Sequence, residues 1–182
     1  MQGEPKSSGF LYWLKVAAIG RRPKRTLVRL ATLIVVCFVV FRFVLIPIRV
    51  SGISMEPTFH DGSVNLINRL AYVYGQPQRG DVAGLRFLTN SGGEVKAVLL
   101  KRLVGLPGDT VSFARGHVCI NGEPEEEPYL KKPCNWNIAP TNLGPDQYYF
   151  VGDNRTMGPA DHIHGIAYRS QILGRVLIKG HD

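Results

Sequence analysis

A serine and a lysine in this sequence have the chemical surroundings of a nucleophile and a general base. Ser54 follows Gly52, which allows unusual backbone angles, and Pro57 stiffens the chain just after it, so a constrained turn is expected there. Lys101 lies in an apolar segment, residues 98–104, with the composition of a β-strand. If its face of the strand is the core, desolvation penalises the ammonium form, and full burial can lower a lysine pKa by about 3–5. A neutral amine can take the proton of a serine hydroxyl.

Both residues also have a simpler interpretation. A serine near glycine and proline is usually an ordinary loop residue. Lys101 can lie on an edge strand with its ammonium in solvent, while the neighbouring Arg102 is buried against a carboxylate. Taken alone, the pattern favours this simpler interpretation of Lys101.

The part of the chain that must position these residues has a β pattern. After residue 51, short apolar stretches alternate with Gly, Pro, Asn and Asp, and no long segment keeps a helical period. We predict a mainly β domain, a sandwich or partly open barrel. The predicted strands are residues 63–67, 81–87, 95–104, 110–114, 117–120, 148–151 and 171–178. Residues 123–147, with four Glu and five Pro, are expected to form a long surface excursion.

An apolar run over residues 27–45 precedes this domain. Its nineteen residues would span roughly 28 Å as a helix, close to the thickness of a bilayer core of about 30 Å. Arg29 and Arg42 lie near its two ends, where long side chains reach the interface. A buried core helix and a cleaved signal peptide are the alternatives. The run holds twelve consecutive uncharged residues, and residues 42–47 offer no small-residue cleavage site, so we predict a retained transmembrane anchor.

Charge is distributed unevenly and predicts the topology. Residues 1–29 hold seven Lys/Arg against one Glu, whereas residues 51–182 hold thirteen basic and thirteen acidic residues. The positive-inside rule therefore predicts a basic cytoplasmic segment, 1–26, a transmembrane helix, 27–45, and an extracytoplasmic catalytic domain, 46–182, at the cell (inner) membrane. Because the excess charge adjoins the apolar run, we expect membrane lipid as a partner and no nucleic acid.

Four blocks of sequence, in this order, resemble the conserved boxes of the type I signal peptidase family. They are residues 51–58 (SGISMEPT), 79–82 (RGDV), 101–109 (KRLVGLPGD) and 152–155 (GDNR). Residues 118–123 and 127–130 also resemble the hairpin region, about 115–147, that the family inserts in its β-rich catalytic domain. The resemblance covers nearly the whole chain from residue 27 to residue 178. It implies a signal-peptidase-like fold and a membrane-bound serine endopeptidase that removes signal peptides from exported preproteins.

The resemblance also implies roles for individual residues. Ser54 would be the nucleophile, with its backbone N–H donating to the oxyanion, and Lys101 the general base. Met55 would line the substrate pocket beside the nucleophile. Gly52 stands where some members carry a serine that adds a second oxyanion donor, so this chain has no side-chain donor there.

The last box departs from the family pattern after residue 155. Gly158 replaces the serine expected to hydrogen-bond the catalytic lysine, Ala160 replaces an acidic residue, and His162 replaces an arginine. If the alignment with the family is shifted by one residue, Asp161 would serve as the acidic residue. Thr156 would supply a hydroxyl in place of the absent serine. We expect Asp153, Asn154 and Arg155 to support the site as scaffold residues, through an ion pair for the two charged ones.

No metal and no cofactor are predicted. His162 and His164 lack a further ligand pair and are interpreted as surface or packing histidines, and the acidic run 125–127 as a solvated loop. Cys119 and Cys134 form either a disulfide or two free thiols, and spacing does not decide between them.

Two alternatives to a general signal peptidase remain open. The divergent segment 156–165 also fits a specialised enzyme, either a pilin or conjugation peptidase or an organellar inner-membrane peptidase. The absent serine at Gly158 also fits a catalytically impaired member that only binds peptides. The sequence does not indicate an oligomeric state.

Overall fold

The structure is a computed structural model that describes residues 22–88 and 95–177. The chain divides into two compact units, Met1–Phe43 and Val44–Asp182, and each is described by itself. Most of the predicted basic segment, residues 1–21, lies outside the described residues.

The first unit contains one long helix. Helix α2 (Pro23–Val39) starts with a proline at its first position, where no backbone N–H is needed, and a π-helical turn, η1 (Val40–Val44), continues it. The segment Lys24–Val44 is long and apolar enough to cross a membrane, and its most apolar part is not buried against other residues of the chain. Leu27, Leu33 and Phe38 are each about 60% exposed, at 61%, 59% and 64%. This exposure argues against the core-helix alternative and fits a helix surrounded by lipid.

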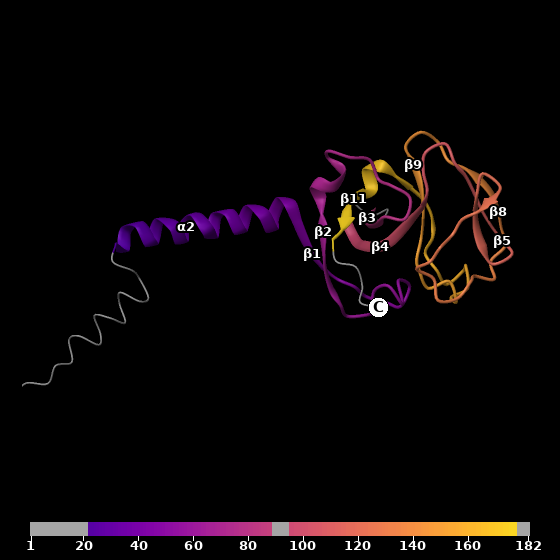
Figure 1. The fold of residues 1–182 in the computed structure, drawn as a ribbon, viewed down its shortest axis with the longest axis horizontal. Coiled ribbons are helices and arrows are strands. Elements are labelled where there is room, and N and C mark those ends of the chain that lie inside the picture. Colours follow the sequence, from indigo (N-terminus) through magenta and orange to yellow (C-terminus); the bar gives the residue numbers. More distant parts are fainter. Residues whose placement is uncertain (1–21, 89–94, 178–182) are drawn as a thin grey trace, which may run out of the picture. The chain divides into compact units, whose positions relative to one another are not determined.

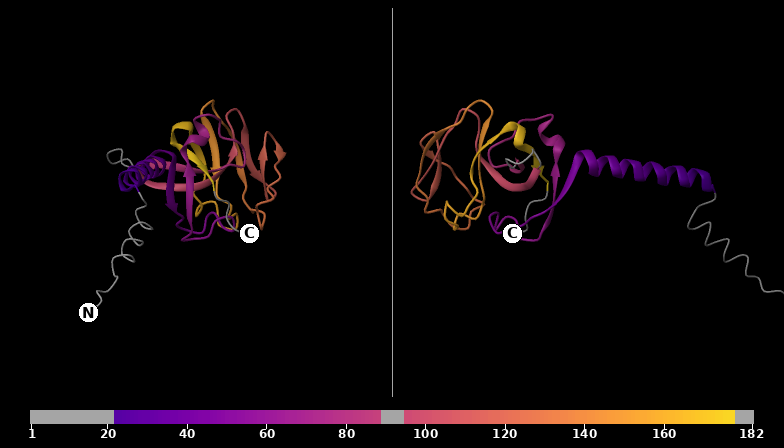
Figure 2. Two further views of the ribbon diagram at one scale, coloured as in Figure 1. Left: turned by 60° about the vertical axis from the view of Figure 1, so that its left-hand side comes forward. Right: turned by 180° about the vertical axis from the view of Figure 1, so that it is seen from behind.

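The second unit is built from two antiparallel sheets (Figure 1). The larger has seven strands in the order β1-β2-β11-β3-β4-β9-β10, and the smaller has four in the order β7-β6-β5-β8. In two views the strands of the small sheet lie at one end of this unit and β1 and β2 at the other (Figures 1 and 2). The bounds are β1 Leu45–Arg49, β2 Val64–Asn68, β3 Val82–Leu88, β4 Val95–Gly105, β5 Thr110–Ala114, β6 His117–Ile120, β7 Glu123–Pro124, β8 Ile138–Asn142, β9 Gln147–Val151, β10 Gly165–Tyr168 and β11 Ile172–Val176. Short 3₁₀ turns, Arg69–Tyr72 and Arg169–Gln171, precede β3 and β11.

The prediction of a mainly β domain is confirmed, and the seven predicted strands correspond to β2, β3, β4, β5, β6, β9 and β11. Four strands were not predicted. Strand β1 continues the apolar run, so Leu45 was assigned to the helix; its Pro47 is tolerated because β1 is an edge strand. Strands β7, β8 and β10 are also short or edge strands with exposed residues, which gives them little alternation of apolar and polar residues.

Three clusters of buried side chains form the core of this unit. One fills the space under the small sheet around Phe113 and Trp136, and a second lies around Leu85, Leu103 and Phe150 of the large sheet. The third consists of Val50, Met55, Phe59 and Leu100. This last cluster anchors the segment between β1 and β2, which carries Ser54, onto strand β4 beside Lys101.

Candidate active site

Ser54 lies on the loop between β1 and β2, in a turn held at both sides. Gly52 has a φ of +96°, in the left-handed region that favours glycine, and its N–H donates to Asp61 Oδ1 at 2.8 Å. Directly after Ser54, the side chain of Met55 is 1% exposed and packs in the third core cluster. The turn is thereby fixed, and Ser54 itself is half-buried. Met55 is a core residue here, and its predicted place in a substrate pocket stays a prediction.

Lys101 lies in the middle of the large sheet, opposite Ala83 of β3. Strand β4 pairs with β3 on one side and β9 on the other, so the edge-strand interpretation of Lys101 is wrong. The side chain is 2% exposed, and its Nζ lies 2.8 Å from Ser54 Oγ. The sheet therefore brings the two predicted residues, 47 positions apart in sequence, into hydrogen-bond contact.

The burial of Lys101 changes its protonation. Desolvation lowers the pKa of Lys101 from 10.5 to about 8, and the negative charge of Asp153 partly opposes this shift. An amine with a pKa near 8 is neutral in an appreciable fraction of molecules at pH 7 to 8. The arrangement provides a hydroxyl with a proton acceptor next to it.

Asp153 is the carboxylate whose negative charge acts on the pKa of Lys101, but its oxygens accept hydrogen bonds from other donors. Arg102 binds it through Nε at 2.8 Å and Nη2 at 2.5 Å, and Thr58 donates its hydroxyl to Oδ2. Arg102 and Asp153 are both buried, at 8% and 2% exposure. The bidentate pair joins strand β4 to the turn after β9 and to the Ser54 loop.

Asn154 connects the turn after β9 directly to Ser54. Its backbone N–H donates to the Ser54 carbonyl at 3.0 Å, and its side-chain amide donates to the Ile53 carbonyl at 3.1 Å. Two carbonyls of the serine turn are therefore held by one residue. Asp153 and Asn154 thus both contact the Ser54 loop, as expected of scaffold residues.

The predicted ion pair between Asp153 and Arg155 is wrong, because Asp153 pairs with Arg102 and Arg155 has a partner that the sequence pattern does not indicate. Arg155 is 1% exposed and donates from both terminal nitrogens to the carboxylate of Glu127, and the Tyr129 hydroxyl donates to the same carboxylate at 2.6 Å. The guanidinium of Arg102 lies over the Tyr129 ring, 3.6 Å from its centroid. The interpretation of residues 125–127 as a solvated loop is therefore wrong for Glu127, whose side chain is 3% exposed. Glu127 and Arg155 are 28 positions apart in sequence, so no local pattern indicates that they form a pair.

The residues of the divergent last box differ in whether they contact the candidate site. Asp161 is exposed, and within residues 22–88 and 95–177 no hydrogen bond joins it to Lys101. Thr156 donates its hydroxyl to Asn154 Oδ1 at 2.6 Å and supports the turn instead of the lysine. His162, by contrast, is 3% exposed and lies against Gly152 of the active-site turn. His162 and His164 both contact the ring of Trp136, as packing histidines do. Cys119 and Cys134 are unpaired.

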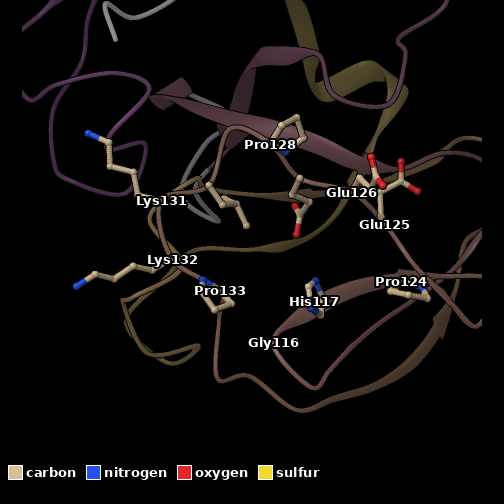
Figure 3. Close-up of a pocket in the computed structure, with 11 residues that line it drawn as sticks. Gly116, His117, Pro124, Glu125, Glu126, Pro128, Lys131, Lys132 and Pro133 are labelled. Atoms are coloured by element: carbon tan, nitrogen blue, oxygen red, sulfur yellow. The ribbon is translucent and has the colours of Figure 1, made fainter.

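A pocket of about 720 Å³ lies away from Ser54 and Lys101, neither of which is among its lining residues. Its lining comes from residues 116–117, 124–128 and 130–133 of the predicted insert. Figure 3 shows Lys131 and Lys132 on one side of it and Glu125 and Glu126 on the other. Since Glu127 is a lining residue, the pocket wall shares a side chain with the Arg155 ion pair.

Known proteins similar to this chain share one family. The family model described as "Signal peptidase, peptidase S26" matches residues 24–179. A signal peptidase I from Leptolyngbya laminosa is 31% identical over 129 residues, which cover 69% of this chain and 64% of the relative. A probable signal peptidase I-2 from Synechocystis is 32% identical over 131 residues, 69% of this chain and 58% of the relative. This chain therefore belongs to the S26 signal peptidase family, and the predicted family resemblance is confirmed.

This chain spans less than two thirds of the length of those two relatives. Signal peptidase IB from Staphylococcus aureus is 27% identical over 168 residues, 82% of this chain and 85% of the relative. A crystal structure of a signal peptidase I from Enterococcus faecalis superposes with a TM-score of 0.40 at 25% identity, over 54% of this chain and 95% of that one.

The Glu127–Arg155 pair leads to a stability prediction. Glu127→Gln leaves the buried guanidinium without a counter-charge, so it is expected to lower the free energy of unfolding by about 3–5 kcal/mol. The double variant Glu127→Leu/Arg155→Met removes both charges and is expected to recover most of that loss. Denaturant unfolding of the full chain in detergent measures both. Glu126→Gln is the matched control because Glu126 is exposed, and its effect should stay within about 0.5 kcal/mol. Equal, small effects of the Glu126 and Glu127 variants would show that the pair does not form.

Proposed function

We propose that this chain is a membrane-anchored serine endopeptidase that removes signal peptides from exported preproteins, with Ser54 as nucleophile and Lys101 as general base. The single observation that carries the proposal is the 2.8 Å contact between Lys101 Nζ and Ser54 Oγ, made by a lysine that is 2% exposed. Membership of the signal peptidase family supports the substrate class. The pair is also the reason to prefer an active enzyme over a catalytically impaired, peptide-binding member.

The chemistry follows from the two side chains. Neutral Lys101 takes the proton of the Ser54 hydroxyl as Oγ attacks the carbonyl carbon of the scissile peptide bond, forming a tetrahedral oxyanion. The Lys101 ammonium then gives its proton to the leaving amine as the C–N bond breaks, which leaves an ester on Ser54. Lys101 next takes a proton from a water molecule that attacks the ester, and Ser54 recovers its proton when the acyl group leaves.

The oxyanion needs a hydrogen-bond donor in this scheme, and the Ser54 backbone N–H is the candidate. Within the described residues this N–H makes no hydrogen bond to a protein acceptor. The Gly52–Asp61 bond and the bonds from Asn154 to the carbonyls of Ile53 and Ser54 hold the peptide groups around it in place. A donor fixed in this way needs no reorganisation as charge develops on the oxyanion.

The helix supports a membrane location for the reaction. Residues Lys24–Val44 suit a single membrane crossing, and the basic residues before it favour a cytoplasmic N-terminus. The catalytic unit would then lie on the extracytoplasmic side of the cell (inner) membrane, with lipid around the helix. Its substrates would reach it as extended peptides with small residues before the cleaved bond, adding to a strand edge.

Substitution of either member of the pair is expected to remove the activity. Ser54→Ala deletes the nucleophile and Lys101→Met deletes the base, so each should lower kcat/KM for preprotein cleavage by about 10³-fold or more. Cleavage is followed with the full chain in detergent and a preprotein that has small residues before the cleavage site. The matched controls are the exposed Ser170→Ala and Lys132→Met, which should cleave like the unaltered enzyme. Full activity of the Ser54 or Lys101 variant would contradict the assignment.

The lowered pKa of Lys101 predicts the pH dependence of cleavage. The base must be neutral, and below its pKa of about 8 the amine is increasingly protonated. The value of kcat/KM should therefore rise with pH, about tenfold per pH unit well below 8, and level off above it. A kcat/KM profile from pH 6 to pH 10 measures this midpoint in the free enzyme. A midpoint near 10.5, or no rise at all, would show that Lys101 is not the base as described.

A further inference from the structure

His162 is a buried histidine whose packing against Trp136 explains the position of its ring but not the hydrogen bonding of its two nitrogen atoms. It follows β9 in the divergent last box, is 3% exposed, and has its ring 5.1 Å from the ring of Trp136 in an edge-on contact. Its Nε2 accepts a hydrogen bond from the Gly152 N–H at 2.7 Å. Since that nitrogen accepts, the imidazole is neutral and carries its proton on Nδ1.

The Nδ1 atom shows that packing alone does not explain this histidine. It is buried and has no hydrogen-bond partner in the part of the chain that the structure describes. An unpaired buried N–H destabilises a protein, and an apolar ring would fill the same space without that cost. The feature an apolar ring lacks is the acceptor at Nε2, which binds Gly152.

Gly152 lies between this acceptor and the catalytic serine. A Cβ atom on Gly152 would lie 2.2 Å from the Ser54 carbonyl oxygen and 2.5 Å from His162 Nε2. Both groups are therefore packed closely against the Gly152 backbone. The Ser54 carbonyl is bound by the N–H of Asn154, two residues further along this turn. A shift of Gly152 would therefore displace Ser54.

We propose that His162 is a positioning residue for Ser54: its neutral imidazole fixes Gly152 against the Ser54 turn and so sets the direction in which Oγ faces Lys101. The proposal rests on the proposed function of the Ser54–Lys101 pair. It assigns a role to the divergent box, which has Gly158 where the family pattern has a lysine-binding serine.

The surroundings of His162 keep its acceptor available. Burial, and then the charges of Lys101, His164 and Arg155, lower the pKa of His162 to about 3, although the Asn154 backbone acts in the opposite direction. The imidazole is therefore neutral throughout the pH range in which Lys101 changes its charge.

Two variants separate the acceptor from the ring. In His162→Gln the side-chain oxygen can occupy the place of Nε2, whereas His162→Phe keeps a ring of similar size and loses the acceptor. The Gln variant is expected to keep kcat within about threefold of the unaltered enzyme, which corresponds to about 0.65 kcal/mol. The Phe variant should lose kcat by on the order of a hundredfold, as for a misplacement of about 1 Å, with KM little changed. The control His117→Phe alters an exposed histidine and should be fully active. His162→Leu provides a second acceptor-free variant in case the Phe variant does not fold.

Hydrogen exchange at the Gly152 amide gives a readout that does not depend on cleavage. The amide should exchange slowly in the unaltered chain and in His162→Gln, and faster in His162→Phe or His162→Leu, while amides of β3 and β4 stay unchanged. Equal exchange at Gly152 in all variants, or equal kcat for the Gln and Phe variants, would overturn the proposal. If the unaltered enzyme cleaves no preprotein, the proposed function is overturned instead. The exchange experiment still tests the contact between His162 and Gly152, because it does not depend on cleavage.

Discussion

The removal of the Lys101 ammonium from water is the constraint on which the rest of this structure depends. A lysine buried to 2% exposure loses most of its hydration, and the loss lowers its pKa to about 8. Lys101 is buried on strand β4, which lies between β3 and β9 in the large sheet. The same burial requires Ser54 to come to the lysine, and the anchors Met55 and Phe59 bring the serine loop onto β4.

Within residues 22–88 and 95–177, the charged groups around Lys101 pair with one another, and none of them forms an ion pair with it. Asp153 is the anion that acts on Lys101, but it is bound at both oxygens by Arg102 and by Thr58. Arg155 is neutralised by Glu127. A direct carboxylate partner would favour the ammonium form and remove the base, so the pairing of the neighbouring charges protects the chemistry as much as the fold. These pairs also tie β4, the turn after β9 and the 127–130 segment together around the site.

The sequence allowed the prediction of Ser54, Lys101 and the β-rich fold, because a lysine in an apolar strand and the four ordered blocks are local signals. It did not allow the prediction of the Glu127 contact, since three adjacent glutamates look like a solvated loop and the partner Arg155 is distant in sequence. Leu45 belongs to β1 and not to the predicted helix, because hydropathy does not mark where the apolar helix ends and the strand begins. Asp161 was considered as an acid by alignment alone, whereas its side chain lies in solvent. His162 had no recognisable signal, because its role depends on how closely the chain folds back onto Gly152.

The central claim is that Lys101 is a neutral base at the pH of the reaction, and direct titration of its side chain tests this most simply. The ¹³Cε and ¹⁵Nζ chemical shifts of Lys101, assigned by loss of the signal in Lys101→Met, can be followed with pH in the detergent-solubilised chain. The structure predicts a midpoint of about 8 for Lys101, well below the ordinary lysine value of 10.5. A midpoint for Lys101 near 10.5 would contradict the account.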